Sequence, residues 1–438
     1  QGEGRIDAVP FDGVWRMPLG TPGAGSQLTG QVELSERFVD TFNIGLPPGS
    51  VTGKGQGEIT INLRAKQAPS FALTSNLQGV DVKIAPLGYR KAPNSRGSLS
   101  VIGKLGGKNT GPPVVERLVF DAPELKANGS VTISAAGTLE RARFDRVRAG
   151  DWLDAPVTLT GRGRNTPPAV ILGGGTLDLR KIPAQNAQGS KVATPLDVTL
   201  DRLQVTESIV LRNFKGAFQS NNGLTGNFTG RLNGKGALSG QTIPRNGRTA
   251  VQIKSRNAGA MISDAGLLKN ANEGAMTLNL TPRAGAGEYD GSLEITNLRL
   301  RDAPPALALL SAASGIGLLE QLDGQGLVFT DVNSRFRITP KTIVITEGSA
   351  VGPSLGLSVD GYYDVASKQL DMQGVVSPFF VINGIGSIFT RRGEGLIGFN
   401  FNADGPAALP RIDVNPLSIF TPGMFREIFR RPPPKLSQ

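Results

Sequence analysis

The chain has 438 residues, a formal net charge of +11, and neither histidine nor cysteine. Without histidine there is no imidazole base for a serine triad and no histidine ligand for zinc or haem. Without cysteine there is no thiolate nucleophile, thiolate metal site or disulfide framework. The basic charge favours anionic partners, but no nucleic-acid-binding motif accompanies it. We therefore predict a non-enzyme that uses no cofactor or metal and binds no nucleic acid.

The chain starts with glutamine, and no signal peptide or membrane-spanning run is visible in it. The longest apolar stretch, residues 306–322, is interrupted by serine and glycine and falls short of the roughly 18–20 apolar residues that a spanning helix needs. We interpret the chain as the C-terminal portion of a longer protein. A targeting signal or membrane anchor is then expected upstream.

Alternation of apolar and polar residues is the dominant pattern along the chain. Residues 58–64, 130–134, 156–160, 276–280 and 355–360 each alternate, as half-buried strands do. Turn pairs such as Asn128-Gly129 and Asn233-Gly234 separate such runs. The pattern predicts a mostly β fold. Because 58 residues are glycine and only 6% are aromatic, we expect an elongated, curved antiparallel sheet with an apolar groove rather than a thick core.

Apolar residues on the clearest strands are the candidates for the groove. Within residues 208–240, phenylalanine or leucine is repeatedly followed by glycine, as in a meander of short strands. Each candidate is also compatible with ordinary packing inside a core. The candidates are Phe214, Phe218, Phe228, Leu232, Phe329, Ile343, Ile345, Leu355, Leu357 and Val359.

A few short helices are predicted only in the C-terminal part, at residues 257–270, 306–322 and about 421–431. We therefore divide the chain into a β-rich groove region, 1–256, and a C-terminal domain, 257–438. In the last helix, Thr421 can cap the first turn and Pro422 suits the first helical position. Its apolar stripe and basic side suggest docking, either against the end of the β-structure or on a membrane surface. The apolar residues are Met424, Phe425, Ile428 and Phe429, and the basic ones are Arg426, Arg430 and Arg431.

One catalytic pattern is present, Gly352-Pro353-Ser354-Leu355-Gly356, which matches the nucleophile elbow of hydrolases. The elbow needs a strand, a sharp turn, a helix and a later histidine. Here Ser354 leads directly into an alternating run, and histidine is missing. We interpret this segment as a turn at the entry to a strand.

The last third of the chain contains a characteristic series of segments. These are residues 297–304 (NLRLRDAP), 348–354 (GSAVGPS), 360–364 (DGYYD) and 370–378 (LDMQGVVSP). Their order resembles the C-terminal region of AsmA-like proteins, especially the long YhdP-type members of Gram-negative bacteria, and the basic, glycine-rich style is similar to that of alphaproteobacterial versions. The segments are structural rather than catalytic.

The resemblance implies a periplasmic body, anchored to the inner membrane by an N-terminal segment that this chain lacks. Such proteins are bridge-like carriers, so phospholipids are the expected cargo, moved between inner and outer membranes along the apolar groove. The C-terminal helix would then meet the outer-membrane surface or an envelope protein. The alternative is an elongated periplasmic scaffold or adhesin-like binding protein in envelope assembly, whose sheet faces are closed by packed side chains.

Overall fold

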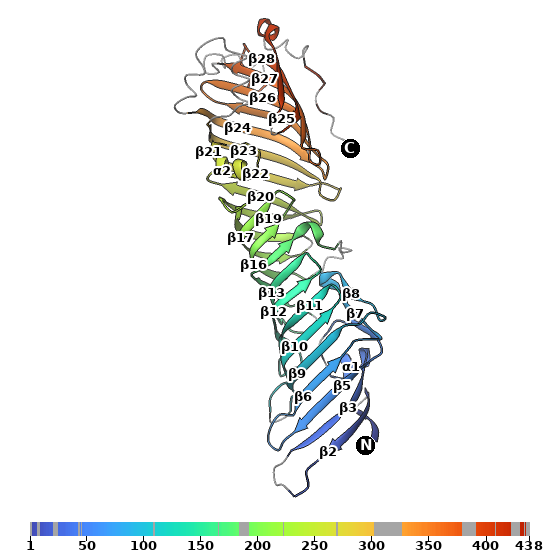
Figure 1. The fold of residues 1–438 in the computed structure, drawn as a ribbon. Coiled ribbons are helices and arrows are strands. Elements are labelled where there is room, and N and C mark those ends of the chain that lie inside the picture. Colours follow the sequence, from blue (N-terminus) through green and yellow to red (C-terminus); the bar gives the residue numbers. More distant parts are fainter. Residues whose placement is uncertain are drawn as a thin grey trace. The chain divides into compact units, whose positions relative to one another are not determined.

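The predicted fold class is confirmed: strands account for 62% of the chain and helices for 7% (Figure 1). This computed structural model describes residues 2–6, 9–20, 25–42, 44, 46–107, 110–164, 166–183, 192–221, 223–268, 270–301, 326–378, 391–407, 409–421, 430–432 and 434. Two compact units are present. Unit 1 comprises residues 1–207 and 213–221, and unit 2 comprises 208–212 and 222–438. The division that we placed after residue 256 therefore falls inside unit 2.

Unit 1 is built on a ladder of strands that pair in chain order. Each strand from β1 to β13 in the ladder pairs antiparallel with the next. The strands are β1 (Gly2–Ile6), β2 (Val9–Arg16), β3 (Ser26–Leu34), β5 (Gly55–Leu63), β6 (Ser70–Ser75), β9 (Ser98–Lys104), β10 (Val114–Ala122), β11 (Leu125–Ile133), β12 (Leu139–Ala149) and β13 (Leu153–Thr160). At about 4.8 Å per strand, such a ladder is long in the pairing direction.

The far end of unit 1 departs from the antiparallel pattern. Strands β14 (Ala169–Gly173) and β15 (Thr176–Asp178) both follow β13 and pair antiparallel with it. Both then pair in parallel with β16 (Thr194–Gln204). The 3₁₀ helix η2 (Leu179–Lys181) follows β15, and β17 (Val210–Ser220) lies in the boundary segment.

A second layer covers part of this ladder, and we call it the strap: residues 35–53 and 77–92. It contains helix α1 (Glu36–Thr41) and a separate three-stranded sheet in the order β4-β7-β8. Its remaining elements are β4 (Val51–Gly53), β7 (Val80–Ile84), η1 (Ala85–Leu87) and β8 (Tyr89–Lys91). The sequence analysis did not predict α1, because a six-residue helix is too short to display an apolar period.

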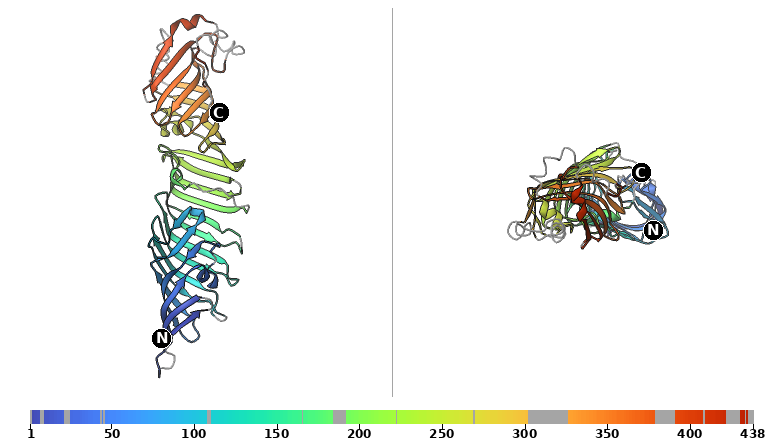
Figure 2. Two further views of the ribbon diagram at one scale, coloured as in Figure 1. Left: turned by 90° about the vertical axis from the view of Figure 1, so that its right-hand side faces the viewer. Right: turned by 90° about the horizontal axis from the view of Figure 1, so that it is seen from above.

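Unit 2 is a second ladder in chain order, seen from a further side in Figure 2. Its strand pairs from β18–β19 to β28–β29 are all antiparallel. The strands are β18 (Leu224–Leu232), β19 (Gly236–Arg245), β20 (Arg248–Ser255), β21 (Ala271–Asn272), β22 (Ala275–Pro282), β23 (Tyr289–Leu300), β24 (Leu327–Ile338), β25 (Thr342–Val351), β26 (Leu355–Asp364), β27 (Gln369–Pro378), β28 (Phe399–Pro406) and β29 (Arg411–Asn415). The 3₁₀ helix η4 (Pro416–Phe420) follows.

Helix α2 (Ala258–Asp264) lies within the predicted helical segment 257–270, and the side chain of Asn257 caps it by accepting a hydrogen bond from the Ala260 amide. Most of the other two predicted helices, residues 306–322 and about 421–431, lies outside the described residues. Among the helices that are described, none combines the length and the apolar character needed to cross a membrane.

Glycines opposite aromatic rings explain part of the unusual glycine content. A Cβ atom at Gly240 would collide with the ring of Phe228 on the neighbouring strand. A Cβ atom at Gly291 would collide in the same way with the ring of Phe336. The large side chains therefore lie flat over their neighbours, which keeps the apolar layer thin.

Candidate functional site: an apolar sheet face in each unit

Strand register in unit 1 aligns one uninterrupted apolar row from β3 to β16. Each member is the direct cross-strand partner of the next, and every member is aliphatic, aromatic or glycine. We call it row A: Leu28, Ile61, Phe71, Gly103, Val115, Val131, Ala142, Leu159, Val170 and Leu196. A second such row runs beside it through Gly30, Ile59, Leu73, Val101, Leu118, Gly129, Phe144, Val157, Leu172 and Val198.

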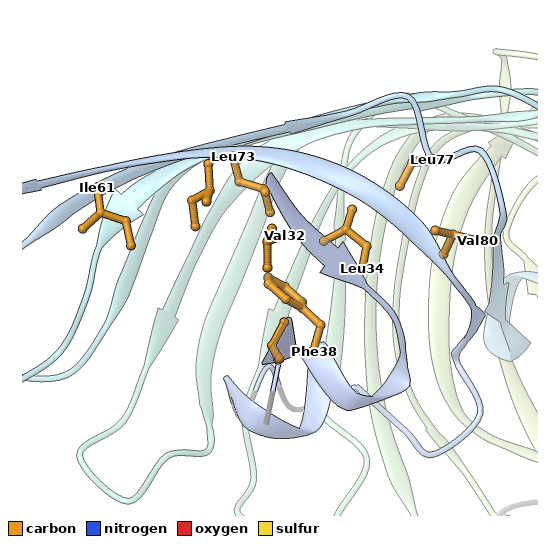
Figure 3. Close-up of a cluster of buried hydrophobic side chains, with 9 residues drawn as sticks. Val32, Leu34, Phe38, Ile61, Leu73, Leu77 and Val80 are labelled. Atoms are coloured by element: carbon orange, nitrogen blue, oxygen red, sulfur yellow. The ribbon is translucent and has the colours of Figure 1, made fainter. Parts of the chain in front are cut away.

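The strap covers one side of this apolar face. Phe38 of α1 packs with Val32, Leu34, Leu77 and Val80 in a buried cluster. Figure 3 shows Phe38 directed at the strands beside Val32 and Leu34, whereas Ile61 lies away from the helix. On the β11–β13 part of the face, a second cluster is formed by Tyr89 of the strap with Leu125, Val147, Ala149, Leu153 and Ala155.

Row A keeps more exposure than the covered side. Leu28, Phe71, Val115, Val131 and Leu159 are only partly buried, whereas Leu125 and Ala155 under the strap are 2% and 1% exposed. Two further members of row A, Ile61 and Ala142, are buried, with 9% and 4% exposure. Half-exposed apolar side chains on a continuous face can contact a further apolar body. Row A is therefore the part of the unit 1 apolar face whose side chains remain accessible to a further apolar body.

Hydrogen bonds from a buried lysine hold residues 77–92 of the strap together. The ammonium of Lys91, a residue only 2% exposed, donates to the backbone carbonyls of Leu77 (2.7 Å), Val80 (3.0 Å) and Ala92 (3.1 Å). Loss of solvent around it lowers the pKa of Lys91.

The neighbouring residues Asp81 and Arg90 add to this anchoring. Arg90 holds Asp81 through both carboxylate oxygens, and its hydrogen bonds lower the pKa of that carboxyl. Burial raises the pKa of Tyr89 to about 12.

Lys91→Met is expected to destabilise the strap by about 1–3 kcal/mol, because three buried carbonyls lose their donor. In the folded protein the pKa of Lys91 lies below the ordinary lysine value of 10.5. The unfolded chain therefore binds more protons between the two values, and strap stability should rise with pH in that window. Hydrogen exchange of β7 and β8 measures both effects. Lys83→Met, at an exposed position of β7, should change neither the stability of the strap nor its dependence on pH. If the stability of the Lys91→Met variant still increased with pH in this window, the assignment to Lys91 would be contradicted.

Unit 2 carries a comparable face. Register aligns one row from β18 to β29 in which Ser334 is the single polar member: Phe228, Gly240, Ile253, Leu278, Leu293, Ser334, Gly348, Val359, Gly374, Phe401 and Val414. A parallel row contains Val251, Leu280, Gly291, Phe336, Ile345, Gly361, Met372, Ala403 and Ile412.

The predicted groove residues divide into two groups. Ile343, Ile345, Leu357 and Val359 are half-buried on the unit 2 face. The other candidates are buried: Phe214, Phe218, Phe228, Leu232, Phe329 and Leu355. Phe214 and Phe218 stack on each other within β17, with ring centroids 6.3 Å apart. Row A was not predicted from the sequence, although the alternation at residues 58–64, 130–134 and 156–160 marks three of its strands.

The candidate docking residues Met424, Phe425, Arg426, Ile428 and Phe429 lie outside the described residues. Arg431 pairs with Asp371 at 2.7 Å and stays half-exposed. Arg430 has a side chain that is only 4% exposed and pairs with Glu394. Its predicted place on an exposed basic side is wrong, because its charge is compensated inside unit 2.

Arg430 belongs to a buried polar network on the face of unit 2 opposite the apolar rows. Ser358 donates to Glu394 at 2.6 Å and accepts from Arg430 at 2.9 Å. Gln373 donates to Asp360 at 2.9 Å and accepts from the Arg431 amide at 2.9 Å. The network ties residues 394 and 430–431 to β26 and β27.

The described residues include no group of three or more acidic side chains placed to hold a metal ion. Ser354 directly precedes β26, as expected of a strand-entry turn.

Comparison of the chain with protein-family models, with curated proteins and with solved structures finds no match.

Proposed function

We propose that the chain carries phospholipids, with their acyl chains against the half-exposed apolar rows of each sheet. Row A supports this most directly, because its register keeps one apolar track continuous from β3 to β16. Each methylene that leaves water contributes about 0.8 kcal/mol, so an acyl chain gains several kcal/mol from a few cross-strand positions. A flat apolar track makes no specific contacts with lipid headgroups, so we expect low lipid specificity.

The resemblance to AsmA-like, YhdP-type proteins extends this proposal to a cellular setting. The chain would be the periplasmic part of a protein anchored in the inner membrane, and its C-terminal residues would meet the outer membrane or an envelope protein. Transport itself needs no enzymatic activity, cofactor or metal.

A structural scaffold is the second candidate, and the strap favours it. Phe38, Leu77, Val80 and Tyr89 fill one side of the unit 1 face as an ordinary core does. A scaffold would bind no lipid, so the presence or absence of bound lipid distinguishes the two functions.

Val131→Glu combined with Leu159→Glu tests the carrier function, because these residues are aligned with Ala142 in row A. Phospholipid that co-purifies with the chain, counted by native mass spectrometry, should fall more than about tenfold. A tenfold loss corresponds to about 1.4 kcal/mol of binding free energy. Burial of two carboxylates against a bound acyl chain would cost more than this.

The matched control is Thr132→Glu with Thr158→Glu, which places the same charges on the opposite face of the same strands. It should retain lipid, and circular dichroism should show unchanged β content in both variants. A lipid-free wild-type chain, or equal lipid loss in the control, would favour the scaffold.

A further inference from the structure

Four of the six exposed residues of one strand of unit 1 are arginines; the other two are Glu140 and Asp145. Along β12 the exposed Arg141, Arg143, Arg146 and Arg148 alternate with apolar-face residues such as Ala142 and Val147, which are 4% and 6% exposed. A register irregularity around Asp145 absorbs one extra residue, which keeps all four arginines on the same face. We call these four residues the arginine row.

The fold compensates this row only in part. Arg146 forms a two-pronged pair with Asp154 at 2.7 and 2.6 Å, and this lowers the pKa of Asp154. Arg143 lies 3.4 Å from Asp145, but both side chains are more than 60% exposed, so the pair is weak. Among the described residues, no carboxylate is paired with Arg141 or Arg148 within 4.0 Å.

Hydroxyl-bearing residues lie directly across from the two arginines at the exposed end of the row. The cross-strand partners of Arg143 are Ser130 and Thr158. Those of Arg141 are Thr132 and Thr160. Arginines two residues apart on one strand are about 7 Å apart, so they repel one another, and a bound anion would relieve this repulsion.

A shallow depression of about 660 Å³ lies at the Arg141 end of the row. Its lining combines Arg141 and one acidic residue, Glu140, with hydroxyl-bearing, apolar and glycine residues: Thr132, Ser134, Thr138, Leu139, Thr160, Gly161 and Gly163. The volume is within the range of small-molecule sites. A cation, several hydroxyls and a hollow of this size therefore meet at one place.

We propose that a linear anionic polysaccharide binds along β12, with one acidic sugar in the depression and its carboxylate on Arg141. The planar guanidinium groups suit carboxylates, and the flanking hydroxyls suit sugar hydroxyls. The cations form a line, and the strands on its two sides, β11 and β13, contribute only one charged residue each, Lys126 and Asp154. A line of cations fits a chain-like polyanion better than a flat lipid surface.

A single-stranded nucleic acid fits this surface poorly, because it would need aromatic side chains for base stacking. The one aromatic residue of β11–β13, Phe144, belongs to the apolar face. The proposal is independent of lipid transport, since the arginine row and the apolar rows occupy opposite faces of the sheet.

Binding of polygalacturonate to the full chain tests the proposal by calorimetric titration at low and physiological salt. Arg141→Gln with Arg143→Gln should weaken binding about tenfold or more and reduce its salt dependence. Arg16→Gln with Arg64→Gln removes the same charge from exposed positions elsewhere in unit 1 and should have little effect. Neutral dextran should not bind.

Two kinds of result would overturn the assignment. If both double variants weakened binding equally, or if polygalacturonate did not bind, the arginine row would not be a specific site and would contribute only to the general positive charge of the protein. Tighter binding of phosphatidylglycerol vesicles or of single-stranded poly(dT), with the same dependence on Arg141 and Arg143, would assign the row to a lipid surface or a nucleic acid instead.

Discussion

Glu394→Ala is expected to destabilise unit 2 by about 3–5 kcal/mol, the usual cost of removing one partner from a buried ion pair. Glu394 and Arg430 have side chains that are 3% and 4% exposed, and Asp360 lies 3.9 Å from Arg430 as a weaker second partner. Removal of Glu394 also takes the acceptor away from the Ser358 hydroxyl. Hydrogen exchange of β26 and β27, together with urea unfolding, should report the loss.

Arg431→Met is the matched control, because its pair with Asp371 is about half-exposed on both sides and should contribute less than about 1 kcal/mol. A double replacement, Glu394→Leu with Arg430→Met, should recover much of the stability, since an apolar pair of similar size can replace a buried ion pair. If Glu394→Ala behaves like Arg431→Met, the network does not hold the C-terminal residues to the sheet.

The fold class was predictable from the sequence because strand alternation is local. A period of two residues already places Ile343 with Ile345, and Leu357 with Val359, on one face of their strands. Which strands are neighbours is a tertiary property, however. The parallel pairing of β14 and β15 with β16 has no local signal, because it depends on where in the sheet β16 adds to the preceding strands.

The candidate site was predictable only in part for the same reason. Alternation identifies the apolar side of each strand, but the length of row A depends on the register of every successive pair. Burial of the face depends on the strap, whose helix is too short to be recognised. Arg430 was misplaced because its partner Glu394 is distant in sequence, and a helical pattern at residues 421–431 contains no information about that contact.

Phe38→Ala is expected to release the strap from the apolar face of unit 1. Phe38 is 9% exposed and packs against Val32 and Leu34, with its ring centroid 4.7 Å from that of Phe42. Truncation of such a buried ring costs about 3–5 kcal/mol. Since a six-residue helix has almost no stability of its own, α1 should open locally while the ladder persists. Hydrogen exchange should accelerate in residues 35–42 and not in β10–β12.

The same variant tests whether the strap competes with lipid for the face. If row A receives acyl chains, exposure of Val32 and Leu34 enlarges the apolar track, and more phospholipid should co-purify per chain. Asp40→Ala, on the exposed side of α1, should alter neither exchange nor lipid content. An opened helix without added lipid would mean that the covered side is core and not a blocked part of the track. Lipid would then be confined to row A, and the strap would serve stability alone.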